Sequence, residues 1–333
     1  MLWKSVCCAV QGRGHAKNNI PCQDKVAKLE ANGIQVIVLA DGAGSAKFSH
    51  FGAERVVTDV AGFIVEKFSY IIAQEDGRNV TRELLIFVLN QLEKESSLHN
   101  CTIKDLASTL LIAAVNEKNF FLAHLGDGVI GYLNDKGLKT VSAPDNGEFA
   151  NETFFVTSSS AAAHMRIYKG ELKNICGFVL MSDGTEQSLY NKKNKTLALA
   201  IKRLMHRTCL IDDKILTPQL EEALNSVVVS NTHDDCSIAL LARTSEQLPP
   251  LEKLPLQERQ KLFQTTGLLF SRKIRQKIFS LDKICALLKT PMTLRQLSQK
   301  LYLKERFVKR KLLPLLDAGI ITKKGTFFET YCQ

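Results

Sequence analysis

Aspartates stand where apolar strands begin or end, and this repeated placement restricts the folds open to the chain most strongly. In VIVLADGAGS the apolar run from Val36 to Ala40 leads directly into Asp41 and a glycine. One Asp before Gly is an ordinary turn former, but five aspartates at the edges of core strands indicate a shared site. The five are Asp24 in PCQDKV, Asp41 in VLADGAG, Asp127 in AHLGDGVIG, Asp183 in FVLMSDGTE and Asp234 in NTHDDCSIALL.

Such a set of carboxylates favours a bound cation. Carboxylates gathered at low-dielectric strand ends repel one another unless a positive ion lies among them. Oxygen ligands alone favour a hard ion such as Mg²⁺ or Mn²⁺. The glycines after Asp41 and Asp183 let the backbone turn and approach an ion closely. We therefore expect the five aspartates to converge on a divalent metal site.

Periodicity predicts two blocks of strands that enclose a pair of helices. These helices are expected at 51–68 and 81–94, where apolar residues recur on one face, and Thr81 is expected to cap the second. Strands are expected at 4–11, 24–30, 35–40, 108–115, 119–125, 129–134, 139–142, 153–157, 177–181 and 236–242, and further helices at 196–206 and 217–227. This order indicates an α+β fold with antiparallel sheets.

The composition is typical of a globular chain in a reducing compartment. A length of 333 residues favours about two domains, and 45% hydrophobic and 23% charged residues are ordinary values. No apolar run approaches the ~18 residues of a membrane span, and the N-terminus becomes polar too soon for a secretory signal. The nine cysteines are scattered without a C-x-x-C pair, which favours reduced thiols. We expect a cytoplasmic protein without a membrane partner.

The net charge of +10 is concentrated at the C-terminal end. Residues 251–333 contain 18 Lys and Arg against 6 Asp and Glu, a net +12, whereas the rest of the chain carries −2. SEQLPPLEKLP, at 245–255, contains three prolines and is the clearest linker. We therefore expect one domain at 1–245, a linker and basic helical segment at 246–280, and a small domain at 281–333, with different partners.

The aspartate motifs resemble those of the metal-dependent serine/threonine protein phosphatases of type 2C. CQD, LADGAGS, HLGDG, LMSDGTE and HDDCSIALL follow one another in the order of that family, and ASTLLIAAV resembles its strand before the Gly-Asp turn. Each motif alone is weak, but five in order are a strong signal. The resemblance covers about residues 4–243, and GHAKNNIPCQD, DGAGS and GEFANET are closest to a bacterial subgroup.

The resemblance implies a fold and a set of ligands. The fold would be a four-layer α-β-β-α sandwich, in which two antiparallel sheets pack face to face with helices outside. Two Mg²⁺ or Mn²⁺ ions would lie at one end, and a water bridging them would attack phosphorus in line, without a covalent phosphoenzyme. The ligands implied by motif position are Asp41 as the bridge, the Gly42 carbonyl, then Asp24, Asp183 and Asp234, and Asp127 for a weaker third site.

Several positions depart from the family pattern. Ala43 stands where many members carry a His proposed as the general acid, so that water or another group must protonate the leaving alkoxide. The phosphate-binding Arg of the family lies a few residues before the first Asp, and here Arg13, His15 and Lys17 compete for that role. Asp235 fills the family's Asn position, and we expect it to cap the chain locally rather than to bind metal.

The C-terminal end resembles a winged helix-turn-helix domain. Helices are expected at 257–279, 281–288, 294–301 and 305–316, followed by a hairpin of strands at 320–323 and 326–331. In DNA-binding members of that class the third helix enters the major groove. The residues available for phosphate contacts are Lys304, Arg306, Lys309, Arg310 and Lys311. The alternatives are a solvated basic face and a wing that docks a protein.

Two classes of function fit these patterns. The main hypothesis is a metal-dependent phosphatase that acts on phosphoserine or phosphothreonine in a phosphoprotein, paired with a Ser/Thr kinase and targeted by its C-terminal domain. The alternative is a regulator that binds a phosphoprotein through a weak or inactive phosphatase fold while the basic end binds DNA. An enzyme for a small phosphate ester is a third hypothesis. The complete aspartate set favours the protein phosphatase, because a non-catalytic relative would be free to lose metal ligands.

Overall fold

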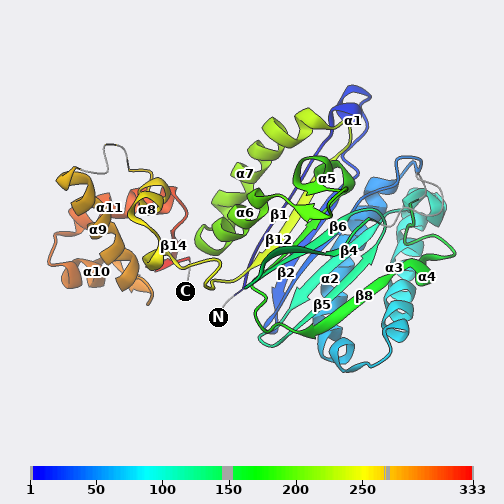
Figure 1. The fold of residues 1–333 in the computed structure, drawn as a ribbon, viewed down its shortest axis with the longest axis horizontal. Coiled ribbons are helices and arrows are strands. Elements are labelled where there is room, and N and C mark those ends of the chain that lie inside the picture. The colour runs from blue at the N-terminus through cyan, green and yellow to red at the C-terminus, as the bar shows by residue number, and fades with distance from the viewer. Residues whose placement is uncertain (1–2, 145–152, 266, 268–270, 332–333) are drawn as a thin grey trace.

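The core of the molecule is a sandwich of two β-sheets, shown in Figure 1. The computed structural model describes residues 3–144, 153–265, 267 and 271–331. Within these residues each of the two main sheets has five strands, and every neighbouring pair in them is antiparallel. The motif GEFANET lies outside the described residues except for its last residue, Thr153.

The first sheet runs in the order β1-β12-β9-β6-β7 and joins the beginning and the end of the sandwich. Its strands are β1 (Lys4–Val10), β12 (Cys236–Ala242), β9 (Gly177–Met181), β6 (Val129–Asn134) and β7 (Gly137–Ser142). β1 pairs with β12 along its whole length, from Lys4 opposite Ala242 to Val10 opposite Cys236. The first strand of the chain is therefore held by the last strand of the sandwich.

The second sheet runs in the order β2-β3-β4-β5-β8. Its strands are β2 (Lys25–Ala31), β3 (Ile34–Ala40), β4 (Leu110–Val115), β5 (Asn119–Leu125) and β8 (Arg166–Glu171). Every residue of β3 and β4 is buried. These strands are covered on both faces, which explains why they read as continuous apolar runs.

Apolar side chains fill the space between the two sheets. Ile37 and Leu39 of β3 and Leu111 of β4 pack there against Phe178 and Leu180 of β9. All five are fully buried. Because this layer removes large apolar surfaces from water, it holds the two sheets face to face.

Two pairs of helices cover the outer faces of the sandwich, as Figure 1 shows. The helices α2 (Ser49–Ala73) and α3 (Gly77–His99) pack on the second sheet. The helices α6 (Leu199–Leu210) and α7 (Asp213–Ala223) pack on the first. The predicted α+β fold, a four-layer α-β-β-α sandwich of two antiparallel sheets, is therefore confirmed.

The structure corrects two expected elements. α3 begins after Asp76, whose carboxylate accepts a hydrogen bond from the Arg78 N–H, so Thr81 lies inside the helix instead of capping it. The stretch 153–157 is not a strand: Thr153 forms an isolated bridge, a turn follows at 156–157, and the next strand is β8. No residue of β8 is buried, because it forms an edge of its sheet, so its sequence lacks the apolar run that marks an inner strand.

Shorter elements connect the layers. They are α1 (Arg13–Lys17), α4 (Ala161–His164), α5 (Asp183–Leu189), the paired strands β10 (Tyr190–Asn191) and β11 (Thr196–Leu197), the 3₁₀-helices η1 (Ile103–Leu106) and η3 (Val229–Asn231), and the π-helix η2 (Leu224–Val228). η2 and η3 lead from α7 towards β12. None of the helices in the described parts of the chain has the length and apolar character needed to span a bilayer.

The C-terminal segment, defined as residues 251–331, is built from short helices and a small sheet. Its elements are η4 (Leu251–Lys253), α8 (Leu256–Leu262), α9 (Arg272–Leu287), β13 (Met292–Thr293), α10 (Leu294–Leu301), α11 (Glu305–Asp317), β14 (Ile321–Lys324) and β15 (Phe327–Thr330). The sheet has the order β13-β15-β14. Thr293 and Gln296 form a capping box on α10, and α11 continues past Pro314. The winged helix-turn-helix assignment stays a prediction.

One boundary of the expected domain division falls inside a helix. The break expected between 280 and 281 lies within α9, and the helix expected at 257–279 is divided between α8 and the start of α9. The division at 245 and 280 stays a prediction, and we propose 272, the first residue of α9, as the start of the last unit.

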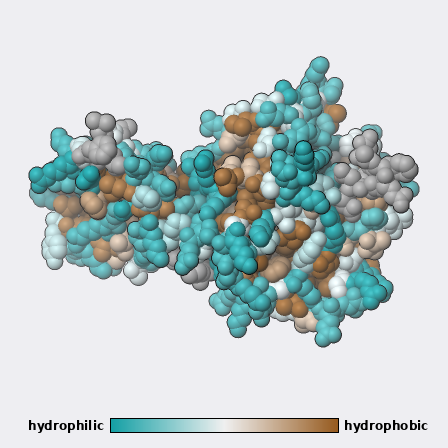
Figure 2. Space-filling model, viewed as in Figure 1, coloured by the Kyte–Doolittle hydropathy of each residue, from teal (hydrophilic) through white to brown (hydrophobic). Residues whose placement is uncertain are grey.

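The C-terminal segment packs against the turn between α6 and α7. The Asp212 N–H donates a hydrogen bond to the Gly319 carbonyl oxygen at 2.7 Å. The ammonium group of Lys4 lies 4.2 Å from the centre of the Tyr331 ring. Ile211 of the turn and Ile320 belong to one continuous buried cluster. Figure 2 shows hydrophilic residues over much of the visible face on both parts, with smaller apolar areas between them.

Gly52 in α2 is required by close packing, whereas Gly62 in the same helix is not. A Cβ on Gly52 would lie 2.0 Å from the Leu106 carbonyl oxygen, while one on Gly62 would meet nothing within 4 Å. We predict that Gly52→Ala lowers the free energy of unfolding by roughly 1–3 kcal/mol through overpacking. Gly62→Ala should raise it by roughly 0.5–1 kcal/mol, because Gly is a weak helix former. Urea denaturation followed by circular dichroism measures both, and equal effects would contradict this account.

Candidate metal-binding active site

The register of the second sheet places two of the predicted aspartates side by side. Lys25 at the start of β2 pairs with Ala40 at the end of β3. Asp24 and Asp41 are the next residues outward along these two strands, so they leave the sheet at the same end. Antiparallel pairing of β2 and β3 therefore explains why Asp24 and Asp41 lie close together, as the motifs predict.

The first sheet brings three more aspartates to that end. β9 ends at Met181 opposite Ile238 of β12, so Asp183, which follows β9, and Asp234, which precedes β12, lie at one edge. Asp127 lies in the turn before β6, which is the other neighbour of β9. Both sheets thus contribute carboxylates to the same end of the sandwich.

Asp41 lies at the centre of the group. The charges that act on its carboxyl group most strongly are those of Asp24, Asp183, Asp127 and Asp234. Burial, followed by these four negative neighbours, raises the pKa of Asp41 well above its usual range. The structure therefore brings together all five aspartates that the sequence motifs single out.

Two neighbours of Asp41 also have raised pKa values. Burial raises the pKa of Asp24 to about 7, although the side chains of Ser182 and Ser237 act in the opposite direction. Burial and the neighbouring aspartates raise the pKa of Asp183 to about 6, although a carboxyl–carboxyl hydrogen bond to Asp41 lowers it. Two carboxyl groups that share a proton in this way avoid carrying both negative charges at once.

The site contains carboxylate oxygens without a donor, and these fit a cation. Among the described residues, nothing donates a hydrogen bond to the buried Oδ2 of Asp24 or Oδ1 of Asp183. No three His, Cys, Asp or Glu side chains in the described residues are already arranged to hold a metal ion. Instead, the carboxyl groups of Asp41 and Asp183 share a hydrogen bond. The unpaired oxygens and the mutual repulsion suit a divalent ion, which prefers oxygen ligands and would displace the shared proton.

The backbone around Asp41 is fixed by its neighbours. The Asp41 N–H donates to Thr109 Oγ1 at 2.9 Å, and the Thr109 N–H donates to the Asp41 carbonyl oxygen at 2.8 Å. The Gly42 N–H donates to the Gln23 carbonyl oxygen at 3.2 Å. A Cβ on Gly42 would lie 2.9 Å from the Ser49 side chain at the start of α2, so a glycine is needed where this strand end approaches the helix.

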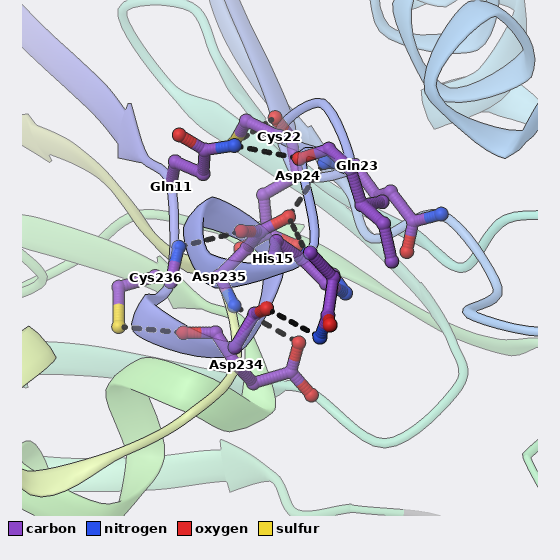
Figure 3. A network of polar contacts seen from close by, with 12 residues as sticks. Gln11, His15, Cys22, Gln23, Asp24, Asp234, Asp235 and Cys236 are labelled. Atoms are coloured by element: carbon purple, nitrogen blue, oxygen red, sulfur yellow. Dashed lines mark hydrogen bonds and ion pairs between the residues drawn. The ribbon is translucent and has the colours of Figure 1, made fainter.

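Asp235 does more than cap the chain locally, as Figure 3 shows. Its carboxylate is 1% exposed and accepts hydrogen bonds from the N–H groups of Gly12 at 2.7 Å and Gln23 at 2.6 Å. Its Oδ2 also lies 2.8 Å from Nδ1 of His15. The expectation of a local cap is therefore wrong, because Asp235 ties the loop before Asp24 to the chain before β12.

The three candidate phosphate ligands lie on this loop and differ in how they are held. His15 is fixed by Asp235 and is 17% exposed. Arg13 is exposed, and its Nε donates to the Thr232 carbonyl oxygen at 3.1 Å. Lys17 is exposed at the end of α1. The structure thus orients His15 and Arg13 against the segment that precedes β12.

Asp127 has a partner outside the central group. Its Oδ2 accepts a hydrogen bond from Thr153 Oγ1 at 2.7 Å.

Nearby at the end of β5, His124 is fully buried, with Nδ1 2.7 Å from Ser142 Oγ and 3.1 Å from Arg166 Nη2. Burial and the positive charge of Arg166 lower the pKa of His124 well below its usual range. His124 is therefore a neutral part of the core rather than a proton donor.

Some residues that support the aspartates carry no recognisable signal in the sequence. The Ser237 N–H donates to Ser182 Oγ at 3.0 Å, and the Ser182 N–H donates to the Ser237 carbonyl oxygen at 3.2 Å. This link fixes the two strand ends behind Asp24, but a serine beside an aspartate has no pattern of its own. A signal exists for Asp235, because a second carboxylate next to Asp234 is unfavourable unless donors surround it.

The fold and the acidic end of the sandwich are together those of a protein serine/threonine phosphatase of type 2C. The chain belongs to the protein phosphatase 2C family, since the model of that family, described as Protein phosphatase 2C, matches residues 11–225, more than half of the chain. The predicted membership is thereby confirmed. The match ends before Asp234, so the place of Asp234 in the site rests on the structure.

Proteins of known sequence or structure are similar to this chain. Serine/threonine-protein phosphatase 3 of Escherichia coli (strain K12) is 24% identical over 200 residues, which cover 57% of this chain and 77% of that protein. A bacterial serine phosphatase matches with a TM-score of 0.51 and 17% identity, over 74% of this chain and 99% of that chain. A C. elegans sex determining protein matches with a TM-score of 0.52 and 12% identity, over 74% and 67% of the two chains. At these identities the structural matches show the fold alone.

Asp234 and Asp235 are adjacent carboxylates that allow a matched test. Asp235→Asn replaces one acceptor oxygen with an amide, so either the Gly12 or the Gln23 N–H loses its partner. We predict a loss of roughly 1–3 kcal/mol in the free energy of unfolding, the cost of an unpaired buried polar group.

Asp234→Asn is the control, because Asp234 is exposed and its negative charge acts unfavourably on Asp183. We expect no destabilisation from it in metal-free protein. Urea unfolding in the presence of EDTA compares the two variants. An equal loss of stability in both would show that Asp235 does not have the bridging role described above.

Proposed function

We propose that the protein is an Mg²⁺- or Mn²⁺-dependent phosphatase that hydrolyses phosphoserine and phosphothreonine in proteins. The observation that carries the proposal is the convergence of four aspartates on Asp41, which raises the pKa of its carboxyl group well above the usual range. Such a concentration of negative charge is unfavourable unless a cation belongs there. Membership of the protein phosphatase 2C family supports phosphoproteins as the substrate class.

Aspartates from both sheets would hold the ions. The groups that would hold the ions are the carboxylates of Asp41, Asp24, Asp183 and Asp234 and the Gly42 carbonyl. When bound, the ions supply an activated water and offset the charge on the phosphate oxygens. The unpaired oxygens of Asp24 and Asp183 support this assignment. Asp127 would serve a weaker third position, because Thr153 already donates to one of its oxygens.

The loop that contains α1 would orient the substrate phosphate. Asp235 holds the His15 ring with Nδ1 towards the carboxylate, which leaves Nε2 for a phosphate oxygen. Arg13 offers the remaining nitrogens of its guanidinium group from the same loop, and a forked donor suits a phosphate. Lys17 has less support, because it is exposed at the end of α1.

Solvent water would protonate the leaving group. Ala43 is buried and has no group that can donate a proton. The nearby His124 is committed to the core by Ser142 and Arg166. Water is therefore the proton source that we assign to the departing serine or threonine oxygen.

We further propose that the C-terminal segment directs the phosphatase to an anionic partner, either DNA or a protein. Four of the five basic residues noted in the sequence are exposed on or beside α11, namely Lys304, Arg306, Lys309 and Arg310. Lys311 differs, because its Nζ donates to Ser280 Oγ at 2.8 Å. Next to the basic residues, Tyr302 is 93% exposed, and basic groups with an exposed aromatic ring suit nucleic-acid binding.

Metal-dependent hydrolysis of a phosphothreonine peptide tests the main proposal. We expect turnover with Mn²⁺ or Mg²⁺ that EDTA abolishes, because the aspartates alone cannot activate water. Asp41→Asn and Asp183→Asn should each lower kcat/KM by roughly 100-fold or more, the scale of losing a group that stabilises the transition state. Asp135→Asn, in the turn at the opposite end of the sandwich, is the control and should keep wild-type activity.

The outcomes separate the candidate functions. A folded, metal-loaded wild type that binds the phosphopeptide without hydrolysing it would contradict the proposal and favour a phosphoprotein-binding regulator. Faster hydrolysis of p-nitrophenyl phosphate than of any phosphopeptide would favour an enzyme for small phosphate esters.

Salt-dependent binding of the full-length chain to a fluorescent DNA duplex tests the role of the C-terminal segment. We predict that Arg306→Ala combined with Arg310→Ala weakens binding by roughly tenfold, because fewer phosphates are then neutralised and fewer counterions are released. Lys67→Ala combined with Lys94→Ala removes the same charge from α2 and α3 and is the control. If the affinity does not depend on salt, or both double variants behave alike, a protein partner is favoured over DNA.

A further inference from the structure

We infer that the hairpin after α5 forms a subsite for a second negative charge on the phosphoprotein substrate. This inference rests on the phosphatase function proposed above. Between β10 and β11 the chain reads KKNK, and Lys192, Lys193 and Lys195 are all exposed. Three positive charges within four residues repel one another, and an anion bound among them would relieve that repulsion.

α5 connects this hairpin directly to the acidic site. Asp183 is the first residue of α5, and Gln187 lies one turn further on the same helix face. Four residues of helix correspond to a rise of about 6 Å. Gln187 and Ser188 line a hollow of about 540 Å³, and Lys192 and Lys193 line it from the side of the hairpin. The hollow thus opens within about one helical turn of Asp183.

A buried carboxylate fixes one of the three lysines. Glu186 is 1% exposed, and its Oε1 lies 2.9 Å from Lys192 Nζ. Among the described residues, no group forms a conventional hydrogen bond with either of its carboxylate oxygens. A buried carboxylate is unfavourable without a charged partner. The ion pair with Glu186 therefore keeps the ammonium group of Lys192 beside α5. The charge of Lys192 is thereby offset, which leaves Lys193, in the lining of the hollow, and Lys195, further along the hairpin, for an anion.

The hairpin is also anchored on the first sheet. The Lys195 carbonyl oxygen accepts a hydrogen bond from Thr140 Oγ1 of β7 at 2.9 Å. Among the described residues, neither Lys193 nor Lys195 forms an ion pair with a carboxylate. Lys193 brings its positive charge to the lining of the hollow. Because the backbone is anchored, the hairpin needs little further ordering to bind an anion.

The spacing identifies the class of substrate. An extended peptide advances about 3.3–3.6 Å per residue, so a group two or three residues from the phosphorylated residue lies about 7–10 Å away. The rise along α5 together with the reach of a lysine side chain covers that span. Figure 2 shows hydrophilic residues over this part of the molecule. We therefore assign to the subsite phosphoprotein segments with an acidic or second phosphorylated residue two or three positions from the target.

A pair of phosphothreonine peptides tests the inference. They are identical except for Asp or Asn at the second and third positions on both sides of the phosphothreonine, and each is assayed for kcat/KM with Mn²⁺. We expect wild type to prefer the acidic peptide by about three- to tenfold, the scale of two exposed ion pairs. The preference should decrease as salt is added, because exposed charges are screened.

Charge reversal in the hairpin is compared with charge reversal elsewhere. Lys193→Glu combined with Lys195→Glu should abolish or invert the preference for the acidic peptide. Lys118→Glu combined with Lys136→Glu makes the same change of net charge in two turns at the opposite end of the sandwich, and should keep the wild-type ratio. Urea unfolding of each variant verifies that the fold is retained.

The readouts distinguish this inference from the proposed function. Wild-type turnover of the neutral peptide supports the phosphatase, while the ratio between the two peptides reports the subsite. If wild type hydrolyses both peptides and the hairpin variant keeps the wild-type ratio, the subsite is refuted and the phosphatase stands. If metal-loaded wild type hydrolyses neither peptide, the proposed function is refuted and the subsite with it.

Discussion

Repulsion among buried carboxylates is the constraint on which the rest of this structure depends. Asp24, Asp41 and Asp183 meet at one end of the sandwich, where burial already disfavours their charged forms. They stay there because each follows or precedes a strand that is locked by antiparallel pairing and by apolar layers on both faces. The large core therefore offsets a local electrostatic cost, which a bound cation would relieve.

Hydrogen-bond donors decide what each carboxylate can do. Asp235 accepts hydrogen bonds from two backbone N–H groups and lies beside the His15 ring, so its carboxylate is used within the protein and organises the loop. Asp24 and Asp183 each have a buried carboxylate oxygen for which the described residues supply no donor, so these two oxygens are available to a ligand. Adjacent positions in the sequence can therefore have opposite roles, and the local supply of N–H groups sets the difference.

Sequence motifs at strand ends predict the residues of the site better than apolar runs predict the edge strands of the sheets. The five aspartates and the inner strands could be predicted, because apolar runs that stop at a carboxylate are visible in the sequence. β8 could not be predicted, because it has no buried residue and no apolar run. The other edge strand of this sheet, β2, is equally unburied, but an Asn-Gly turn joins it to the inner strand β3. The partners of Asp235 could not be predicted either, because Gly12 and Gln23 lie more than 200 residues away in the chain. Contacts of that range depend on the finished topology rather than on any local pattern.

The pairing of β1 with β12 has a consequence for synthesis on the ribosome. A chain is made from its N-terminus, and domains fold as units while the chain emerges. Among the strands of the sandwich β1 is made first, but within the described residues it pairs in the sheet with the last of these strands alone, with Lys4 opposite Ala242. Asp234 enters the acidic group at the same late stage. The nascent protein therefore has no complete site until nearly all of the sandwich has been made, and the C-terminal segment, which follows, docks on a finished enzyme.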